Sequence, residues 1–247
     1  MISASRPLPA PPSLCNLQTQ SRLALFLDFD GTLIDIAGEP DAVSVPRHLT
    51  ARLERLNERM GGALALVTGR SIDNLERFLG NPMVHLAGSH GDDVRAPSGI
   101  ILRESKPLPL PVAEAMDRFA AASGLLYEHK AHGGALHYRA RPDLEADARD
   151  FAAILANAHG LVTKSGKCVV ELVWPSADKG GAVALLTARA PFAGATPVFI
   201  GDDITDEDGF AACSRLGGFG IAVGERSSAA ARFSLETVKD VHTWLEL

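Results

Sequence analysis

Three short apolar segments of this sequence end in residues that could do chemistry. The segments and the polar residues after them are 23–27 with Asp28 and Asp30, 63–67 with Thr68, Gly69 and Arg70, and 197–200 with Asp202 and Asp203. Carboxylates gathered at one place repel each other, and a cation must offset this repulsion if they are to stay ionised at neutral pH. Oxygen ligands without histidine or cysteine favour Mg²⁺. If the segments are neighbouring strands, the sequence therefore predicts a magnesium site at their ends.

The apolar segments are typical of strands buried on both faces of a parallel sheet, because apolar and polar residues do not alternate within them. Amphipathic helical patterns lie between them, for example at residues 46–60 and 178–190. Strands and helices alternate in this way in doubly wound α/β domains. Ligands of such domains bind beyond the carboxyl ends of the strands, which is where the polar residues stand.

A different rhythm occupies residues 106–176, which begin with a proline-rich segment. A helical pattern followed by two strand-like segments occurs there twice, which predicts a small α+β unit with an antiparallel sheet. We expect this unit to be inserted in an α/β core made of residues 22–105 and 177–247. Residues 1–21 contain clustered prolines and polar residues, so we expect a disordered tail there.

The composition predicts a folded protein that binds neither nucleic acid nor a membrane. The 247 residues carry a formal net charge of −6, and no dense run of Lys and Arg provides the basic face of a nucleic-acid binder. No apolar stretch approaches the roughly 18 residues that span a bilayer. The three cysteines are widely spaced, which fits a reducing compartment. We expect a cytoplasmic monomer.

Each acidic group also has a plain structural explanation. An Asp-Gly pair is common in turns, and an aspartate after a strand often caps the following helix. This explanation accounts less well for acidic strand ends that recur together with Thr68 and a later Lys179.

Four motifs give the chain a resemblance to the haloacid dehalogenase (HAD) superfamily. The motifs are, in order, Asp28-Phe29-Asp30-Gly31-Thr32-Leu33, Thr68, Lys179, and Gly201-Asp202-Asp203-Ile204-Thr205-Asp206-Glu207. Other segments resemble the trehalose-6-phosphate phosphatase family within it, namely Gly88-Ser89-His90-Gly91, Glu128-His129-Lys130, His137-Tyr138-Arg139, and Lys167 with Glu171-Leu172. The resemblance implies a HAD-like, doubly wound (Rossmann-like) parallel-sheet core with an inserted α+β cap of the C2B type.

The resemblance also implies a Mg²⁺-dependent phosphatase that hydrolyses trehalose 6-phosphate, the final step of trehalose synthesis. Asp28 would attack phosphorus and form an aspartyl-phosphate, and Asp30 would act as general acid and then as general base. Thr68 and Lys179 would stabilise the phosphoryl group. The implied metal ligands are Asp28, the backbone carbonyl of Asp30, and Asp202, with Asp203 and Asp206 behind them.

The implied substrate-binding residues lie in both parts of the chain. They are Gly69, Arg70 and His90 in the core, and Glu128, Lys130, Arg139, Lys167 and Glu171 in the insert. Strand alternation places Glu128 and Lys130 on one face of a sheet, and it does the same for Lys167 and Glu171. Mixed charges suit sugar hydroxyls, which both donate and accept hydrogen bonds, although such charges are also common on solvated sheet faces.

Several alternatives stay open. Arg70 either contacts the substrate or closes the edge of the site, and His90 is either functional or an ordinary loop histidine. Asp203 could orient Lys179 or Thr68 instead of binding the metal. The protein could also be another sugar-phosphate phosphatase, a phosphohexomutase, or a non-catalytic sugar-phosphate sensor. A sensor usually lacks the nucleophile or the acid, and both are present here.

Overall fold

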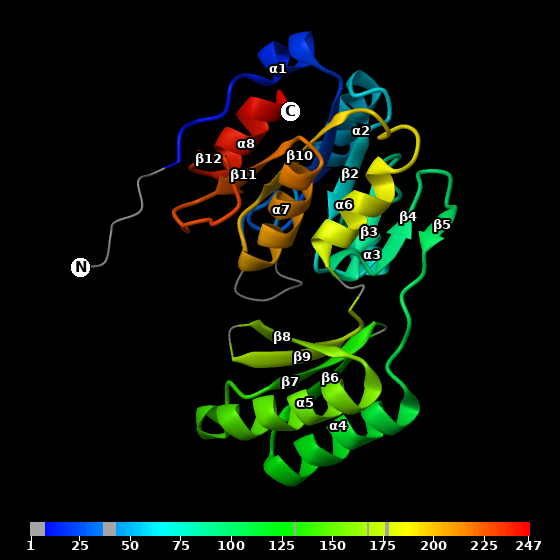
Figure 1. Cartoon of the computed structure of the whole chain (residues 1–247), viewed down its shortest axis with the longest axis vertical. Helices are drawn as coiled ribbons and strands as arrows, with labels where there is room; N and C mark the ends of the chain where they lie inside the picture. The colour runs from blue at the N-terminus through cyan, green and yellow to red at the C-terminus, as the bar shows by residue number, and fades with distance from the viewer. Residues whose placement is uncertain (1–7, 37–42, 131, 167, 176–177) are drawn as a thin grey trace, which may run out of the picture. The chain divides into compact units, whose positions relative to one another are not determined.

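The structure, a computed structural model, describes residues 8–36, 43–130, 132–166, 168–175 and 178–247. The chain divides into two compact units, which we call the core unit (Met1–Arg103 with Asp178–Leu247) and the cap unit (Glu104–Ala177). Figure 1 shows the elements of each unit. Among the described helices, none combines the length and the apolar composition that a bilayer crossing requires.

The core unit is built on an eight-stranded sheet with the order β12-β11-β10-β1-β2-β3-β4-β5. Six strands pair in parallel, namely β1 (Leu23–Leu27), β2 (Leu64–Val67), β3 (His85–Gly88), β10 (Thr196–Gly201), β11 (Phe219–Val223) and β12 (Phe233–Leu235). The strands β4 (Asp93–Arg95) and β5 (Ile101–Arg103) extend the sheet in antiparallel pairing. The sequence did not predict β4, β5 or β12.

Helices cover both faces of this sheet, because alternate residues of the buried strands point to opposite sides. One hydrophobic cluster joins Leu25 and Leu66 to the helices α1 (Leu14–Gln20), α2 (Leu49–Arg59), α3 (Ile72–Leu79) and α8 (Val238–Leu245). The other joins Phe26 and Val67 to α6 (Lys179–Thr187) and α7 (Glu207–Arg215). The prediction of a doubly wound α/β core is therefore confirmed.

The prediction of a disordered N-terminal tail is wrong beyond residue 7. Leu14 is buried at the start of α1. The backbone oxygen of Pro9 accepts the N–H of Ser234 at 3.0 Å, and that of Pro12 accepts Trp244 Nε1–H at 2.8 Å. Proline lacks an N–H but keeps its carbonyl acceptor, so these two prolines can attach the segment to β12, the edge strand of the sheet, and to α8.

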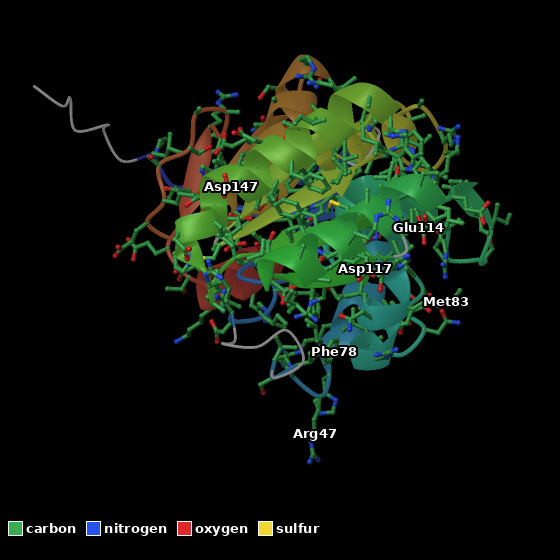
Figure 2. All side chains as sticks on the ribbon, turned by 90° about the horizontal axis from the view of Figure 1, so that it is seen from below. Arg47, Phe78, Met83, Glu114, Asp117 and Asp147 are labelled. Atoms are coloured by element: carbon green, nitrogen blue, oxygen red, sulfur yellow. The ribbon has the colours of Figure 1, made fainter. Side chains whose placement is uncertain are left out.

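The cap unit has a four-stranded antiparallel sheet with the order β6-β7-β9-β8 and two helices on one face. Its elements are α4 (Leu110–Ser123), β6 (Leu126–Lys130), β7 (Gly133–His137), α5 (Glu145–His159), β8 (Val162–Gly166) and β9 (Val169–Val173), with the short helix η2 (Pro142–Leu144) before α5. Alternate strand residues such as Leu136 and Leu172 pack against the helices. The outer face of the helices is acidic, with Glu114, Asp117 and Asp147 exposed to solvent (Figure 2).

Candidate active site

The ends of β10, β1 and β2 bring predicted catalytic residues together. These three strands are direct neighbours in the sheet, so their carboxyl ends share one edge. The pairing continues one residue beyond β1 and β2: Asp28 N–H donates to Ile200 O, and Thr68 N–H donates to Ala87 O, each at 2.9 Å. The condition on which the predicted site depended, that the strands are adjacent, is met.

Lys179 lies at the buried centre of the site, at the first position of α6. Its Nζ is 2.8 Å from Asp28 Oδ1 and 2.6 Å from Asp206 Oδ1. Burial alone would lower the pKa of Lys179, but the charges of Asp28 and Asp206 outweigh it and raise that pKa above its usual range. Burial raises the pKa of Asp28 well above its ordinary value, although Lys179 opposes the effect. The lysine is therefore a fixed positive charge beside the predicted nucleophile.

Asp28, Asp202 and Asp206 each place one carboxylate oxygen within 4.8 Å of the others. With Lys179 they form what we call the core cluster. Asp202 Oδ1 is buried without a hydrogen-bond partner, and burial, helped by Asp206 and Asp203, raises the pKa of Asp202 to about 6. A buried acceptor that lacks a donor and a set of hard oxygen ligands both fit a Mg²⁺ ion.

Gly31 fixes the side-chain end of Asp202. Its φ is +74°, and a Cβ atom there would lie 2.2 Å from Asp202 Oδ2. A side chain at position 31 would therefore displace the carboxylate. Asp-Gly pairs are common in ordinary turns, but Gly31 of the Asp30-Gly31 pair also has a packing role in the site.

Asp206 has both carboxylate oxygens engaged within the protein. Oδ1 accepts from Lys179, and Oδ2 accepts the N–H of Asp203 at 2.8 Å. The side chain of Asp203 accepts in return from the backbone of residue 206, which caps the short helix η3 (Ile204–Asp206). One open alternative had Asp203 orienting Lys179, and in the structure Asp206 makes the contact with that lysine.

Arg70 binds Asp30 in a contact that the sequence analysis missed. Its Nε lies 2.6 Å from Asp30 Oδ2 and its Nη2 lies 2.7 Å from Oδ1, so the two side chains form a bidentate pair. Nη1 donates to Asn74 Oδ1 at 2.8 Å, and the guanidinium lies over the ring of Phe78 at 5.0 Å. The Arg70 side chain is only 10% exposed. It therefore holds the predicted general acid, a role that neither open alternative had included.

The loops after β2 and β3 are joined by backbone hydrogen bonds. His90 N–H donates to Thr68 O at 2.9 Å, and Ser89 N–H donates to Arg70 O at 2.7 Å. His90 has a φ of +58°, an uncommon conformation for a residue with a side chain. A Cβ at Gly69 would lie 2.7 Å from His90 Cε1, so the glycine leaves room for the imidazole beside Thr68.

Four polar side chains form a second group on the open face of the cap sheet, which we call the cap cluster (Glu128, Lys130, His137 and Glu171). Lys130 Nζ lies 2.5 Å from Glu171 Oε1 and 3.9 Å from Glu128 Oε2, and His137 Nε2 lies 2.9 Å from Glu128 Oε2. Ala135 stands between Glu128 and Glu171 in the strand register, so the longer side chains can meet above it. Arg139 follows β7 and is exposed, and the predicted Lys167 lies outside the described residues.

The profile of the family described as trehalose-phosphatase matches residues 26–239. This chain belongs to the trehalose-phosphatase family. It is 40% identical over 205 residues to a probable trehalose-phosphate phosphatase of Sinorhizobium fredii, a match that covers 81% of this chain and 77% of the relative. It is 37% identical over 238 residues to trehalose-6-phosphate phosphatase of Escherichia coli, covering 93% and 88%.

Solved structures show that this member of the trehalose-phosphatase family has the HAD fold with a cap. The C-terminal domain of C. albicans trehalose-6-phosphate phosphatase matches with a TM-score of 0.78 at 22% identity, covering 99% of this chain and 100% of that one. A haloacid dehalogenase-like hydrolase from Bacteroides thetaiotaomicron matches with a TM-score of 0.68 at 17% identity, and the match covers 92% of this chain and 98% of that one. The C-terminal domain of a Candida albicans trehalose synthase regulatory protein matches with a TM-score of 0.73 at 11% identity, and the match covers 96% of this chain and 99% of that one. At these identities the likeness concerns the fold alone.

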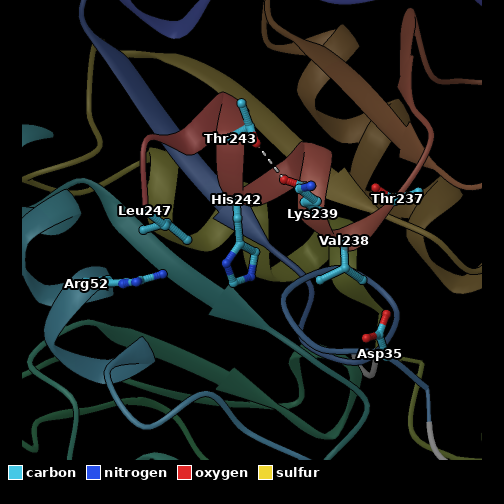
Figure 3. Close-up of a pocket in the computed structure, with 8 residues that line it drawn as sticks. All are labelled: Asp35, Arg52, Thr237, Val238, Lys239, His242, Thr243 and Leu247. Atoms are coloured by element: carbon cyan, nitrogen blue, oxygen red, sulfur yellow. Dashed lines mark hydrogen bonds between the residues drawn. The ribbon is translucent and has the colours of Figure 1, made fainter.

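A pocket of about 560 Å³ in the core unit is separate from the core cluster (Figure 3). Its lining is formed by Asp35, Arg52, Thr237, Val238, Lys239, His242, Thr243 and Leu247. The imidazole of His242 meets the backbone oxygen of Leu33 at 2.8 Å. Because none of the clustered carboxylates lines this pocket, we do not assign the chemistry of the trehalose-phosphatase family to it.

Arg226 lies near the site, and the sequence analysis did not include it among the candidate site residues. It lies in the loop after β11 and donates to the backbone oxygens of Asp202 and Asp203. Every residue offers a backbone oxygen, so no pattern of side chains in a trehalose-phosphatase sequence indicates this contact.

Proposed function

We propose that this protein hydrolyses trehalose 6-phosphate to trehalose and phosphate through an aspartyl-phosphate on Asp28. The observation that carries the proposal is the buried contact of Lys179 with Asp28, beside the unpartnered oxygen of Asp202, in a chain of the trehalose-phosphatase family. Lys179 occupies one oxygen of Asp28 and leaves the other to attack phosphorus.

In the first step, an oxygen of Asp28 forms a bond to phosphorus, and the bond from phosphorus to the sugar oxygen breaks. Asp30 donates a proton to that sugar oxygen. In the second step, Asp30 takes a proton from water, the water oxygen bonds to phosphorus, and the bond to Asp28 breaks. Lys179 and the hydroxyl of Thr68 stabilise the negative charge on the phosphoryl oxygens in both steps.

Asp28, the backbone oxygen of Asp30, and Asp202 would hold Mg²⁺. When bound, the ion offsets the charge of the carboxylates and of the phosphoryl group. The residues of the chain do the rest of the work: they position the phosphoryl group and move the protons. Arg70 donates to both carboxylate oxygens of Asp30, so Asp30 must give up part of this contact before it can donate a proton.

The cap cluster and Arg139 would bind the disaccharide. A protonated lysine and an arginine donate hydrogen bonds, and the glutamates accept them, which matches the hydroxyls of a sugar. Lys167 and the core residues Gly69 and His90 complete the proposed substrate-binding set. We also propose a cytoplasmic monomer; light scattering that gives the mass of one chain would support the oligomeric state.

Phosphate release from a panel of sugar phosphates, with Mg²⁺ and with EDTA, tests the proposal. We expect trehalose 6-phosphate to be hydrolysed fastest, EDTA to stop the reaction, and Asp28→Asn to abolish it. A preference for another sugar phosphate would favour a different phosphatase of the same fold. Transfer of phosphate within a hexose would indicate a mutase, and absence of release from every substrate would favour a sensor.

A further inference from the structure

We propose that Arg226 is a positioning residue that holds Asp202 in place for the metal. Its guanidinium donates from Nε to the backbone oxygen of Asp202 at 3.1 Å and from Nη2 to that of Asp203 at 3.0 Å. Both bonds come from one rigid planar group, so they fix the orientation of two successive peptide units. The backbone orientation determines the direction in which the Asp202 side chain leaves the chain.

Glu207 holds Arg226 in this position. Its Oε1 accepts from Arg226 Nη2 at 2.7 Å, and its Oε2 accepts the N–H groups of Ala229 and Ala230 at 3.2 and 2.9 Å. Arg226 Nη1 also donates to the backbone oxygen of Ser227 at 2.9 Å. The loop after β11 is thereby attached to the loop after β10, its neighbour in the sheet.

Asp202 is therefore constrained at both ends. Gly31 lies against its carboxylate, and Arg226 binds its carbonyl. Its Oδ1 stays buried and without a donor between these contacts. A carboxylate held in this way needs little reorganisation when a cation binds, and partners behind metal ligands typically contribute about 10–100-fold in metal affinity.

The alternative is that Arg226 and Glu207 are an ordinary surface ion pair, since the two side chains are 31% and 20% exposed. The two explanations predict opposite signs. By charge alone, removal of a cation near three carboxylates should strengthen the binding of a divalent cation. Removal of a positioning residue should weaken it.

The test is a titration of metal-free protein with Mn²⁺, in which electron paramagnetic resonance measures the free ion. We expect Arg226→Gln to bind Mn²⁺ about 10–100-fold more weakly than the wild type. Arg226→Lys keeps the charge but cannot span two carbonyls, so we expect it to bind weakly as well. Arg215, at the C-terminal end of α7, provides the control. Arg215→Gln removes a charge of the same sign away from Asp202, and this variant should bind Mn²⁺ as the wild type does.

A second measurement, the Mg²⁺ activation constant for phosphate release, should rise by a similar factor, while kcat at saturating Mg²⁺ changes much less. Unchanged or tighter Mn²⁺ binding by Arg226→Gln would overturn the inference, as would full recovery by lysine. If Arg226→Gln does not fold, Arg226→Lys decides the question, because charge alone predicts unchanged Mn²⁺ binding and the loss of positioning predicts weaker binding.

This inference rests on the proposed function only for the assignment of Asp202 as a metal ligand. The Mn²⁺ titration needs no substrate, so it remains decisive if trehalose 6-phosphate is not the substrate. Absence of Mn²⁺ binding by the wild-type protein would overturn both. Normal binding without phosphate release would overturn the proposed function alone.

Discussion

The core cluster and the cap cluster each place one lysine beside two carboxylates, but they differ in access to water. The central lysine of the core cluster, Lys179, has a side chain that is 3% exposed, and that of the cap cluster, Lys130, is 21% exposed. Buried charges interact strongly, and they cost a great deal when a partner is lost. Charges at the surface interact weakly and exchange partners with water easily.

The difference fits the two proposed tasks. A phosphoryl group has the same charge and geometry in every substrate, so a rigid buried site can be prepared for it in advance. The cap cluster lies on an open sheet face, and its contacts can be exchanged for hydrogen bonds to a sugar. The comparison predicts that substitutions in the core cluster affect both stability and chemistry, whereas those in the cap cluster affect recognition.

Substitution of the two lysines tests the comparison most severely. Lys179→Met leaves the buried carboxylates of Asp28 and Asp206 without a counter-charge, so we expect loss of activity and a decrease of about 3–5 kcal/mol in the free energy of unfolding. Lys130→Met should cost about 0–1 kcal/mol. Urea unfolding of both variants in EDTA measures the difference. Equal losses of stability would show that burial does not separate the two clusters.

The pair of Arg70 and Asp30 tests whether positioning in the core unit extends to proton transfer. Arg70→Gln frees Asp30, and we expect kcat for trehalose 6-phosphate to fall by about 10–100-fold, a part of what general acid catalysis contributes. The release of nitrophenolate from p-nitrophenyl phosphate in the first turnover needs no proton donor and should change little.

Stopped-flow measurement of that first turnover, compared with steady-state phosphate release, separates the two effects. An equal loss in both assays would mean that Arg70 supports the shape of the site instead of the proton transfer. Arg77→Gln serves as the control, because it also removes one positive charge, from an arginine on α3.

Glu171→Ala tests the recognition role of the cap cluster. The loss of a hydrogen bond to a charged group costs about 1.5–3 kcal/mol. We therefore expect kcat/KM for trehalose 6-phosphate to fall by roughly 10–100-fold. Hydrolysis of p-nitrophenyl phosphate, which carries no sugar, should be spared, and Arg139→Ala should act in the same direction. Arg141→Ala removes an exposed arginine that pairs with Asp143 in the cap unit. This variant should hydrolyse both substrates as the wild type does. Equal losses on both substrates would contradict sugar recognition by the cap.

The sequence could predict the parts of the site that depend on local pattern and on the rule for sheet edges. Short unbroken apolar runs marked β1, β2 and β10, and the first polar residue after each one marked Asp28, Thr68 and Asp202. Those residues converge because adjacent parallel strands end at one edge. The same local signal is weak for β4 and β5, which have three residues each, and they were missed.

The contacts that the sequence could not predict join segments far apart in the chain. Pro9 meets Ser234, and Arg226 meets the backbone of Asp202, in each case through a carbonyl group that all residues share. The composition of residues 8–21 therefore indicated disorder, although their carbonyl groups had partners. Several acidic side chains were possible partners of Arg70. Its guanidinium lies over the rings of Phe29 and Phe78 and donates to Asn74, and these packing contacts, which the sequence does not show, place it beside Asp30.

The smallest expected effect concerns pH. Burial raises the pKa of Asp202 to about 6, whereas an aspartate in an unfolded chain has a pKa of about 3.9. Without metal, the stability that protonated Asp202 contributes is therefore present below about pH 4 and is lost as the pH rises to about 6. Mg²⁺ competes with this proton, so the increase in Tm caused by Mg²⁺ should be small at about pH 5 and should level off above about pH 7.

Thermal unfolding with Mg²⁺ and with EDTA across this range measures the effect. Asp202→Asn should abolish the Mg²⁺-dependent increase in Tm at every pH, because it removes both the proton site and the ligand. Glu171→Gln, in the cap cluster, should keep the wild-type profile. An Mg²⁺ effect of equal size at all these pH values would contradict a buried carboxylate as its origin, and it would remove the electrostatic distinction between the two clusters, since an exposed carboxylate binds a cation without a raised pKa.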